Sequence, residues 1–247
     1  MERAEYERLA ALDRRLWWFR GLHAQMLGAL ARRRAPEDGE RVLDAGCGTG
    51  GLLSAFGERF SAGASFGIDI DATAGAVAGA SSGRPICVGS VNALPFVEAG
   101  FAAILSADVL CHRAVDEEAA LRQFLRCLSP GGVLVLNLPA YRWLLSQHDT
   151  AVHNVRRYTA ASVRGLLAAA GFASVRTSYW NTLLFPLMVL RRKLGWRGSA
   201  SQGSDVALLP APVEALFRLI VRMEAALLSL GLRLPFGGSV LATAVKP

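Results

Sequence analysis

A glycine-rich turn near residue 46 has the residue types of a ligand-binding loop. Residues 42–51 read Val-Leu-Asp-Ala-Gly-Cys-Gly-Thr-Gly-Gly, a pattern typical of a buried strand that runs directly into a helix. Its alternating glycines are Gly46, Gly48 and Gly50. They would let a ligand lie against bare backbone, and the helix start offers free N–H groups to a carboxylate or phosphate. Asp69, at the end of the next apolar segment, is placed to accept both hydroxyls of a ribose.

Two of the four histidines are candidates for proton transfer. His112 follows an apolar segment at 101–105, and His148 follows another at 133–138. Histidine is the usual base near neutral pH, and both positions fall at the carboxyl edge of a parallel sheet. We expect His148 to act as the base, with Asp149 either orienting it or capping a turn. His112 is the alternative, as is a reaction without a protein base. No metal site is predicted, because the His and Cys residues lack ligand spacing.

The order of apolar and amphipathic segments predicts the fold that would position these residues. Strands are expected at 41–45, 65–68, 86–88, 101–105, 133–138, 175–180 and 240–245. Helices lie between most of them. Asp116 and Thr159 are suited to cap two of these helices. Such alternation is typical of an α/β protein whose mostly parallel sheet is covered on both faces.

Two flanking regions depart from this alternation. Residues 1–34 have helical apolar spacing and would form an N-terminal helical cap on a core at 35–180. Residues 181–237 hold two very apolar helices and would form an insert or lid before a last core strand at 238–247. Arg191, Arg192 and Lys193 follow the first of these helices.

The insert leaves two alternatives open. Its helices either wall an apolar pocket lined by Leu183, Phe185, Leu216 and Phe217, or lie on an anionic membrane. The polar residues of the second helix include Glu214, Arg218 and Arg222, at near-four spacing. We read them as one narrow polar stripe, and this favours the pocket, since a surface-binding helix usually has a broader charged face.

The charge is unevenly distributed along the chain. The net charge is +7, yet residues 35–150 hold thirteen acidic and seven basic residues, whereas 151–247 hold three acidic and twelve basic ones. An acidic centre argues against a nucleic-acid binder. The basic flanks either meet an anionic substrate, membrane or RNA, or reflect compositional bias alone. A charged N-terminus and four cysteines without CxxC pairs predict a cytoplasmic protein, with contact at the inner membrane surface left open.

Three further segments identify a family resemblance. Residues 89–96, 104–112 and 128–134, in this order after the glycine-rich turn, resemble the class I S-adenosylmethionine-dependent methyltransferases that act on small molecules and lipids. The resemblance implies a Rossmann-like seven-stranded sheet in the order 3-2-1-4-5-7-6, with strand 7 antiparallel.

The same resemblance implies a set of cofactor contacts. Asp44 and the three glycines would face the methionine part and the adenosine of S-adenosylmethionine, and Asp69 would bind the ribose. Ile70 would pack on the adenine, with Ser90 and Val91 at its edge. Asp108 would begin the segment that lines the sulfonium and the substrate, and Arg20 could reach the methionine carboxylate. The family usually has Asp where this chain has Ser90, so a neutral hydroxyl would replace a charged partner.

A largely uncharacterised subgroup shares further elements with this chain: Trp-Trp-Phe-Arg at 17–20, Ser-x-His-Asp at 146–149 and Arg-Arg-Tyr-Thr at 156–159. Arg156 and Arg157 could hold a substrate phosphate or pair with acidic groups. We predict methyl transfer to a hydrophobic, potentially anionic small molecule, with oxygen the first choice of acceptor atom, then nitrogen or carbon. The alternative is a non-catalytic module that binds the cofactor and docks a membrane or a partner enzyme. The oligomeric state is open.

Overall fold

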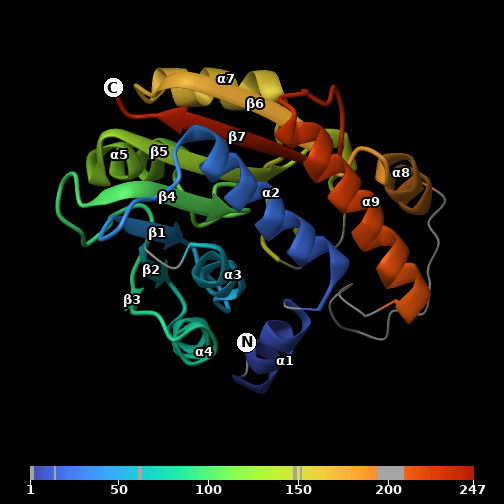
Figure 1. The fold of residues 1–247 in the computed structure, drawn as a ribbon, viewed down its shortest axis with the longest axis horizontal. Helices are drawn as coiled ribbons and strands as arrows, with labels where there is room; N and C mark the ends of the chain where they lie inside the picture. The colour runs from blue at the N-terminus through green and yellow to red at the C-terminus, as the bar shows by residue number, and fades with distance from the viewer. Residues whose placement is uncertain (1–2, 14, 61–62, 147–148, 151, 194–208) are drawn as a thin grey trace.

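One seven-stranded sheet forms the centre of the computed structural model (Figure 1). The structure describes residues 3–13, 15–60, 63–146, 149–150, 152–193 and 209–247, and of 3–5 and 191–193 only the backbone. The strands are β1 (Arg41–Ala45), β2 (Ala64–Asp69), β3 (Ile86–Val88), β4 (Phe101–Ala107), β5 (Leu128–Pro139), β6 (Ala173–Trp180) and β7 (Ser239–Val245). Their order is β3-β2-β1-β4-β5-β7-β6, and β7 pairs antiparallel with both neighbours. The predicted order and the antiparallel last strand are therefore confirmed.

The strand β5 begins earlier than the sequence suggested. Residues 129–132 lie within β5 but do not follow a regular ladder, because Leu128 pairs with Phe101 whereas Val133 already pairs with Ala103. The Gly131 N–H donates to the Lys246 carbonyl, and the Lys246 N–H donates to the Gly132 carbonyl. The Ser-Pro-Gly-Gly segment, with a positive φ of 74° at Gly131, is therefore an irregularity in the strand that the residue after β7 holds in place.

The helices flank this sheet. They are α1 (Arg3–Asp13), α2 (Trp17–Arg33), α3 (Gly51–Arg59), α4 (Ala72–Ser82), α5 (Glu117–Cys127), the 3₁₀ turn η1 (Arg142–Leu144), α7 (Ala160–Ala169), α8 (Phe185–Lys193) and α9 (Ala211–Ser229). The predicted caps are present. Asp116 accepts from the Ala119 N–H, and Thr159 shares a capping box with Ser162.

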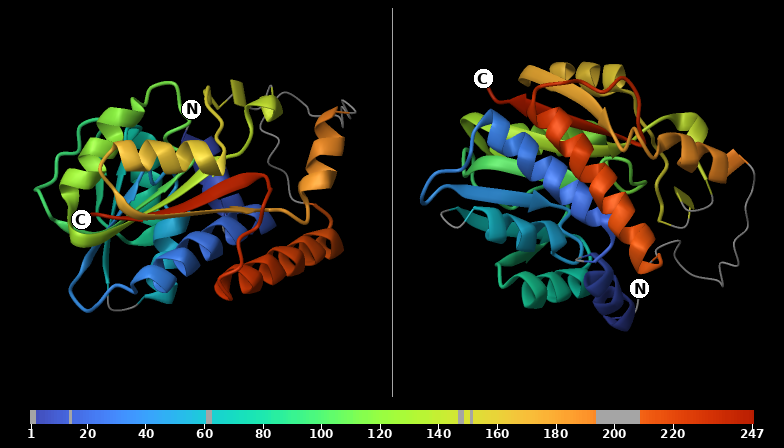
Figure 2. Two further views of the ribbon diagram at one scale, coloured as in Figure 1. Left: turned by 90° about the horizontal axis from the view of Figure 1, so that it is seen from above. Right: turned by 45° about the vertical axis from the view of Figure 1, so that its right-hand side comes forward.

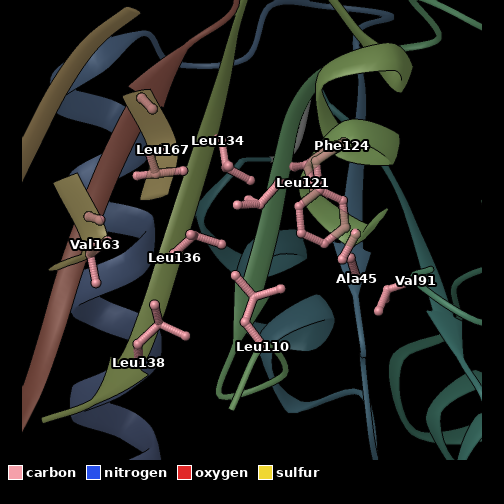
Figure 3. Close-up of a cluster of buried hydrophobic side chains, with 14 of the residues drawn as sticks. Ala45, Val91, Leu110, Leu121, Phe124, Leu134, Leu136, Leu138, Val163 and Leu167 are labelled. Carbon is pink, nitrogen blue, oxygen red and sulfur yellow. The ribbon is translucent and has the colours of Figure 1, made fainter. Parts of the chain in front are cut away.

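Alternate residues of β5 face two different layers. Leu134, Leu136 and Leu138 point towards the side covered by α5 and α7 (Figure 3). Val133 and Val135 belong to the core under α2 and α9. Figure 2, left, shows α2 and α9 on one face of the sheet and α5 and α7 on the other. This strand therefore joins both halves of the core, as expected for a buried strand.

The helix α9 packs along α2 at a point of close approach. Gly21 has no side chain, and a Cβ there would lie 2.5 Å from Cγ1 of Val221. The two carboxylates of α9 face inwards. Glu214 is 4% exposed and accepts from the N–H groups of Trp17 and Leu209, and Glu224 is 1% exposed.

The predicted polar stripe of this helix is therefore wrong for Glu214. Its carboxylate is buried because it satisfies backbone N–H groups that are remote in sequence. Glu224, which the stripe did not include, has the same role. It accepts from the N–H groups of Asn181, Thr182 and Leu183, the turn that leaves β6. Because Asn181 adopts a positive φ of 57°, no regular strand or helix could satisfy these donors.

Replacing Glu224 with Ala should destabilise the protein strongly. The change leaves two buried N–H donors, of Asn181 and Thr182, and the partly buried one of Leu183 without this acceptor, and one buried donor already costs ~1–3 kcal/mol. We expect a loss of at least about 3 kcal/mol in the free energy of unfolding, measured by urea denaturation. Glu224→Gln should retain part of that stability through its amide oxygen. The exposed Glu118→Ala is the matched control, and an equal loss in both Ala variants would contradict this role.

Candidate active site

A cleft of about 350 Å³ opens at the carboxyl ends of β1 and β4. Its volume lies within the usual range for small-molecule sites. Trp18, Phe19, Leu22 and His23 of α2 form one wall, and the glycine-rich turn forms the floor. The N-terminal helices expected to act as a cap therefore contribute directly to the site. A larger but shallower hollow beside α5 lacks the turn and is lined partly by the Arg156–Glu117 ion pair.

The three glycines of the turn have different roles. All have positive φ: 85° at Gly46, 51° at Gly48 and 84° at Gly50. A Cβ at Gly46 would lie 2.3 Å from Val109, and one at Gly50 would lie 2.9 Å from the backbone of Ala78. A Cβ at Gly48 would meet nothing within 4 Å. Gly48 therefore borders open space for a ligand, whereas Gly50 lets α3 pack on α4 and does not line the cleft.

Carboxylates dominate the electrostatics of the cleft. Asp13, Asp44 and Asp108 line it, and Asp69 lies beside the turn, where it accepts from the Gly48 N–H at 2.8 Å. Burial, with Asp69 and Asp13 nearby, raises the pKa of Asp44 to about 8. Its Oδ2 is buried and has no hydrogen-bond partner among the described residues. No Lys or Arg is among the described residues that line the cleft.

This charge distribution distinguishes between candidate cofactors. A dinucleotide carries an anionic pyrophosphate, which these carboxylates would repel. S-adenosylmethionine carries an ammonium and a sulfonium, and the buried, unpaired oxygen of Asp44 is a suitable acceptor for the ammonium. The residues present therefore fit S-adenosylmethionine.

The contact between Asp13 and His23 was not predicted. Asp13 ends α1 and receives the Thr49 hydroxyl at 3.3 Å, and it lies 3.5 Å from Nε2 of His23. Burial lowers the pKa of His23 to about 4, so at neutral pH this contact is not an ion pair. The only signal in the sequence was the helical spacing of residues 4–33. That spacing does not reveal which tertiary neighbour α1 meets.

Exposure and hydrogen bonding differ among the other predicted cofactor contacts. The second oxygen of Asp69 accepts from the Asp71 N–H, and Ile70 is 67% exposed beside it, open to a stacking ring. Ser90 accepts from the Asn92 N–H. The Val91 side chain is buried in the main core, so its backbone alone could face a ligand. Arg20 is exposed and is not among the residues that line the cleft.

Asp108 is held at the end of β4 by a buried relay. The indole N–H of Trp180 donates to Oδ1 of Asn137 at 2.6 Å, and the Asn137 amide donates to Oδ1 of Asp108 at 3.0 Å. Trp180 and Asn137 are both fully buried. Asp108 has a positive φ of 55°, and such strain is common at functional positions. Burial raises its pKa to about 7, against the lowering effects of Asn137 and Arg157.

The segment 149–158 forms the roof of the cleft. Val152 and Asn154 line it, and the Val155 N–H donates to the Cys111 carbonyl. Both oxygens of Asp149 accept from Arg157, and Oδ2 also accepts from the N–H and hydroxyl of Ser146. Burial raises the pKa of Asp149, but these donors outweigh it and the pKa lies below the ordinary value. Asp149 therefore joins Ser146 to Arg157, while His148 itself lies outside the described residues.

His112 lines the cleft with a defined hydrogen bond. Its Nδ1 accepts from the Ala114 N–H at 3.2 Å, which places the proton of the neutral ring on Nε2. Burial lowers its pKa, as do His153 and Arg113, against an opposing effect of Asp69. Neutral His112 therefore offers a donor at Nε2. Among the residues that the structure describes, no three His, Cys, Asp or Glu side chains gather as a metal site.

Replacing Asp44 with Asn should weaken cofactor binding in a pH-dependent way. A carboxyl with a raised pKa must lose its proton to bind an ammonium, so wild-type affinity should rise by up to about tenfold per unit between pH 6 and pH 8. The Asn variant should lose at least about tenfold at pH 8 and show a flatter profile. Calorimetry with S-adenosylhomocysteine at three pH values measures the affinity and its pH dependence for the wild type and the variant. Parallel profiles for the two proteins would contradict this role.

Alanine at Gly48 and at Gly50 should have separable effects. Both changes cost ~1–2 kcal/mol of backbone strain at positive φ. Gly48→Ala should weaken cofactor binding by about tenfold or more, because its Cβ enters the ligand space. Gly50→Ala should lower the melting temperature further, because its Cβ meets the backbone of α4. Thermal unfolding and calorimetry on both variants test this, and the reverse ranking would refute the assignment.

Comparison with known proteins agrees with this geometry. Residues 18–177 match the family model described as a methyltransferase domain, which is more than half of the chain. Over 111 residues the chain is 33% identical to O-methyltransferase cnsE of Penicillium expansum. That match covers 42% of this chain and 40% of the relative, so the chain matches less than half of this curated protein.

Several solved structures share the fold. A complex of the Haloferax volcanii Trm112 methyltransferase activator with a methyltransferase matches with a TM-score of 0.61 at 21% identity, covering 99% of this chain and 97% of that one. Phosphoethanolamine N-methyltransferase 2 of Haemonchus contortus, bound to S-adenosylmethionine, gives 0.60 at 17%, covering 90% and 52%. Geranyl diphosphate C-methyltransferase of Streptomyces coelicolor gives 0.59 at 15%, covering 93% and 80%. The matched residues 18–177 include the glycine-rich turn and the cleft carboxylates Asp44 and Asp108, and the chain belongs to the methyltransferase-domain family.

Proposed function

We propose that this chain transfers the methyl group of S-adenosylmethionine to a hydrophobic small molecule. The observation that carries the proposal is an acidic cleft at a glycine-rich turn, without Lys or Arg among its described lining residues. When bound, the cofactor supplies a methyl group already activated on a sulfonium. The protein then has to align the acceptor atom with that methyl group and exclude water.

An aromatic cluster supports a hydrophobic acceptor. Tyr141 follows β5, stacks on Tyr179 and Trp143, and contacts Phe185 at the start of α8. Phe236 packs on Phe185 from the segment before β7. Trp143 and Phe236 remain 57% and 42% exposed, so the cluster presents aromatic surface beyond the carboxyl end of β5. The relatives named above act on oxygen, nitrogen and carbon, so we keep oxygen as the first choice of acceptor atom and nitrogen or carbon as the next.

Transfer to a hydroxyl or amine needs a proton acceptor. The bound cofactor would supply the methyl group and be left as a thioether, and the acceptor's proton would pass to a base of the protein or to water. His148 remains our predicted base, and His112 is the alternative that sequence offered. Asp108 is a third candidate that the geometry adds, because its carboxyl lines the cleft and has a pKa near neutrality. The Nε2–H of His112 is better suited to donate a hydrogen bond to the acceptor.

Variants of these three residues should separate their roles. An active acceptor is first found by screening hydroxyl, amine and prenyl compounds with labelled cofactor. With that acceptor, loss of the base should lower turnover by ~10²-fold or more. The variants are His148→Asn, His112→Asn and Asp108→Asn, and product mass spectrometry measures transfer. Removing the base should also abolish the acidic limb of the pH–rate profile. His153→Asn is the matched control, because His153 contacts the His112 ring but does not line the cleft.

Two results would overturn this proposal. Failure to bind S-adenosylmethionine or S-adenosylhomocysteine would refute the cofactor assignment. Binding without turnover on any acceptor class would favour the non-catalytic alternative, a cofactor-binding module that docks a partner enzyme or a membrane.

A further inference from the structure

The helix α9 carries its apolar side chains on the outside. Leu216, Leu219, Met223, Leu227 and Leu230 recur at three- and four-residue spacing at its solvent side, and each is between 36% and 78% exposed. Glu214 and Glu224 are buried on the opposite side. We call the five exposed residues the α9 apolar stripe. Apolar side chains therefore lie on both faces of α9, because Val221 and Leu228 are buried in the core. An exposed apolar surface of this kind is commonly an interaction site.

The position of α9 leaves this stripe accessible. The helix lies on the outside of α2, at the lower edge of the molecule in Figure 2, left. Leu216 is 52% exposed, and none of the described residues of α8 and α9 lines the cofactor cleft. The stripe therefore does not line the cofactor cleft.

The charged groups around the stripe are positive. Arg222 of α9 and Arg233, just after it, are exposed. Between residues 209 and 247 the acidic residues are Glu214 and Glu224, and both are buried against backbone N–H groups. This surface therefore presents leucines and guanidinium groups without an exposed carboxylate from the same segment.

A cluster of arginines lies at the C-terminal end of α9. Arg33 of α2 donates to the hydroxyl of Thr243 at 2.8 Å and to backbone carbonyls, which are uncharged partners. Burial lowers the pKa of Arg33, and the guanidinium groups of Arg176 and Arg233 lower it further. The three arginines are therefore close enough to repel one another, and an anion between or beside them would relieve that repulsion.

We propose that the α9 apolar stripe docks on the surface of an anionic lipid bilayer. The leucines would enter the boundary between headgroups and acyl chains, while Arg222, Arg233 and the arginine cluster would face anionic headgroups. The contact is peripheral, because no described helix is long and apolar enough to cross a membrane. A second copy of this face is a poorer occupant, since it would place like-charged guanidinium groups opposite one another.

Vesicle flotation with the full chain tests this proposal. We expect the protein to float with vesicles of phosphatidylcholine and phosphatidylglycerol and to stay in the dense fraction with phosphatidylcholine alone. Raising the salt to about 1 M should reduce flotation, because headgroup attraction is then screened. These two comparisons establish whether an anionic surface is required.

Two sets of variants divide the apolar and the charged contributions. The triple variant Leu216→Ser, Leu219→Ser, Met223→Ser should bind about a hundredfold more weakly, roughly fivefold for each side chain. Arg222→Gln with Arg233→Gln should lose roughly fivefold per arginine. The matched control is Val88→Ser with Val97→Ser, because these valines are 56% and 68% exposed on other parts of the surface. Unchanged melting temperatures and S-adenosylhomocysteine affinities would show that every variant is folded.

Three flotation results would overturn the proposal. They are absence of flotation with anionic vesicles, flotation of the triple variant at the wild-type level, and equal loss in the valine control. Size-exclusion chromatography with light scattering gives a further test. A wild-type dimer that becomes a monomer in the triple variant would also overturn the proposal, because the stripe would then serve self-association. None of these outcomes depends on methyl transfer, so the failure of one proposal does not decide the other.

Discussion

Burial of several carboxylates in one cleft is the constraint on which the site depends. Asp13, Asp44 and Asp108 line one cleft with Asp69 beside it, and burial prevents water from screening them fully. Backbone N–H groups neutralise part of this charge, as Gly48 and Asp71 do for Asp69. Burial raises the pKa of Asp44 to about 8 and that of Asp108 to about 7. Neighbouring carboxylates add to this effect, Asp69 and Asp13 for Asp44 and Asp149 for Asp108. A cation that enters the cleft would stabilise these carboxylates in their charged form.

The fold concentrates these carboxylates by placing strand ends together. Asp44, Asp69 and Asp108 each come from the carboxyl end of a different parallel strand, β1, β2 and β4. Neighbouring parallel strands necessarily bring their carboxyl ends to one edge. Two buried networks then fix the surroundings. Trp180 and Asn137 hold Asp108, and Arg157 with Ser146 holds Asp149 and the roof. In the motifs at 146–149 and 156–159, Ser146, Asp149 and Arg157 thus hold one another in place beside the cleft.

The same principle, that buried donors require acceptors, explains the orientation of α9. Glu214 and Glu224 turn inwards because Trp17, Leu209 and the turn at 181–183 present backbone N–H groups that nothing else satisfies. With its carboxylates committed to the interior, the helix is left with leucines and arginines outside. Packing of α9 on α2 also couples this surface to the helix whose side chains wall the cofactor cleft.

The sequence by itself determined the parts of this protein that depend on local pattern. Segment order and apolar periodicity predicted an α/β protein with a mostly parallel sheet, and the family resemblance implied its strand order. The glycine-rich turn with Asp69 predicted where a cofactor binds. Side-chain caps at Asp116 and Thr159 followed from residue type alone. Only the tertiary structure decided which partners remote segments meet. It placed Asp13 and His23 in the cleft, left Arg20 outside it, and joined Asp149 to Arg157. It also buried the two carboxylates of α9 and left a row of its leucines exposed. A periodic pattern defines two faces of a helix, but which face is buried depends on unsatisfied donors that lie far away in the chain.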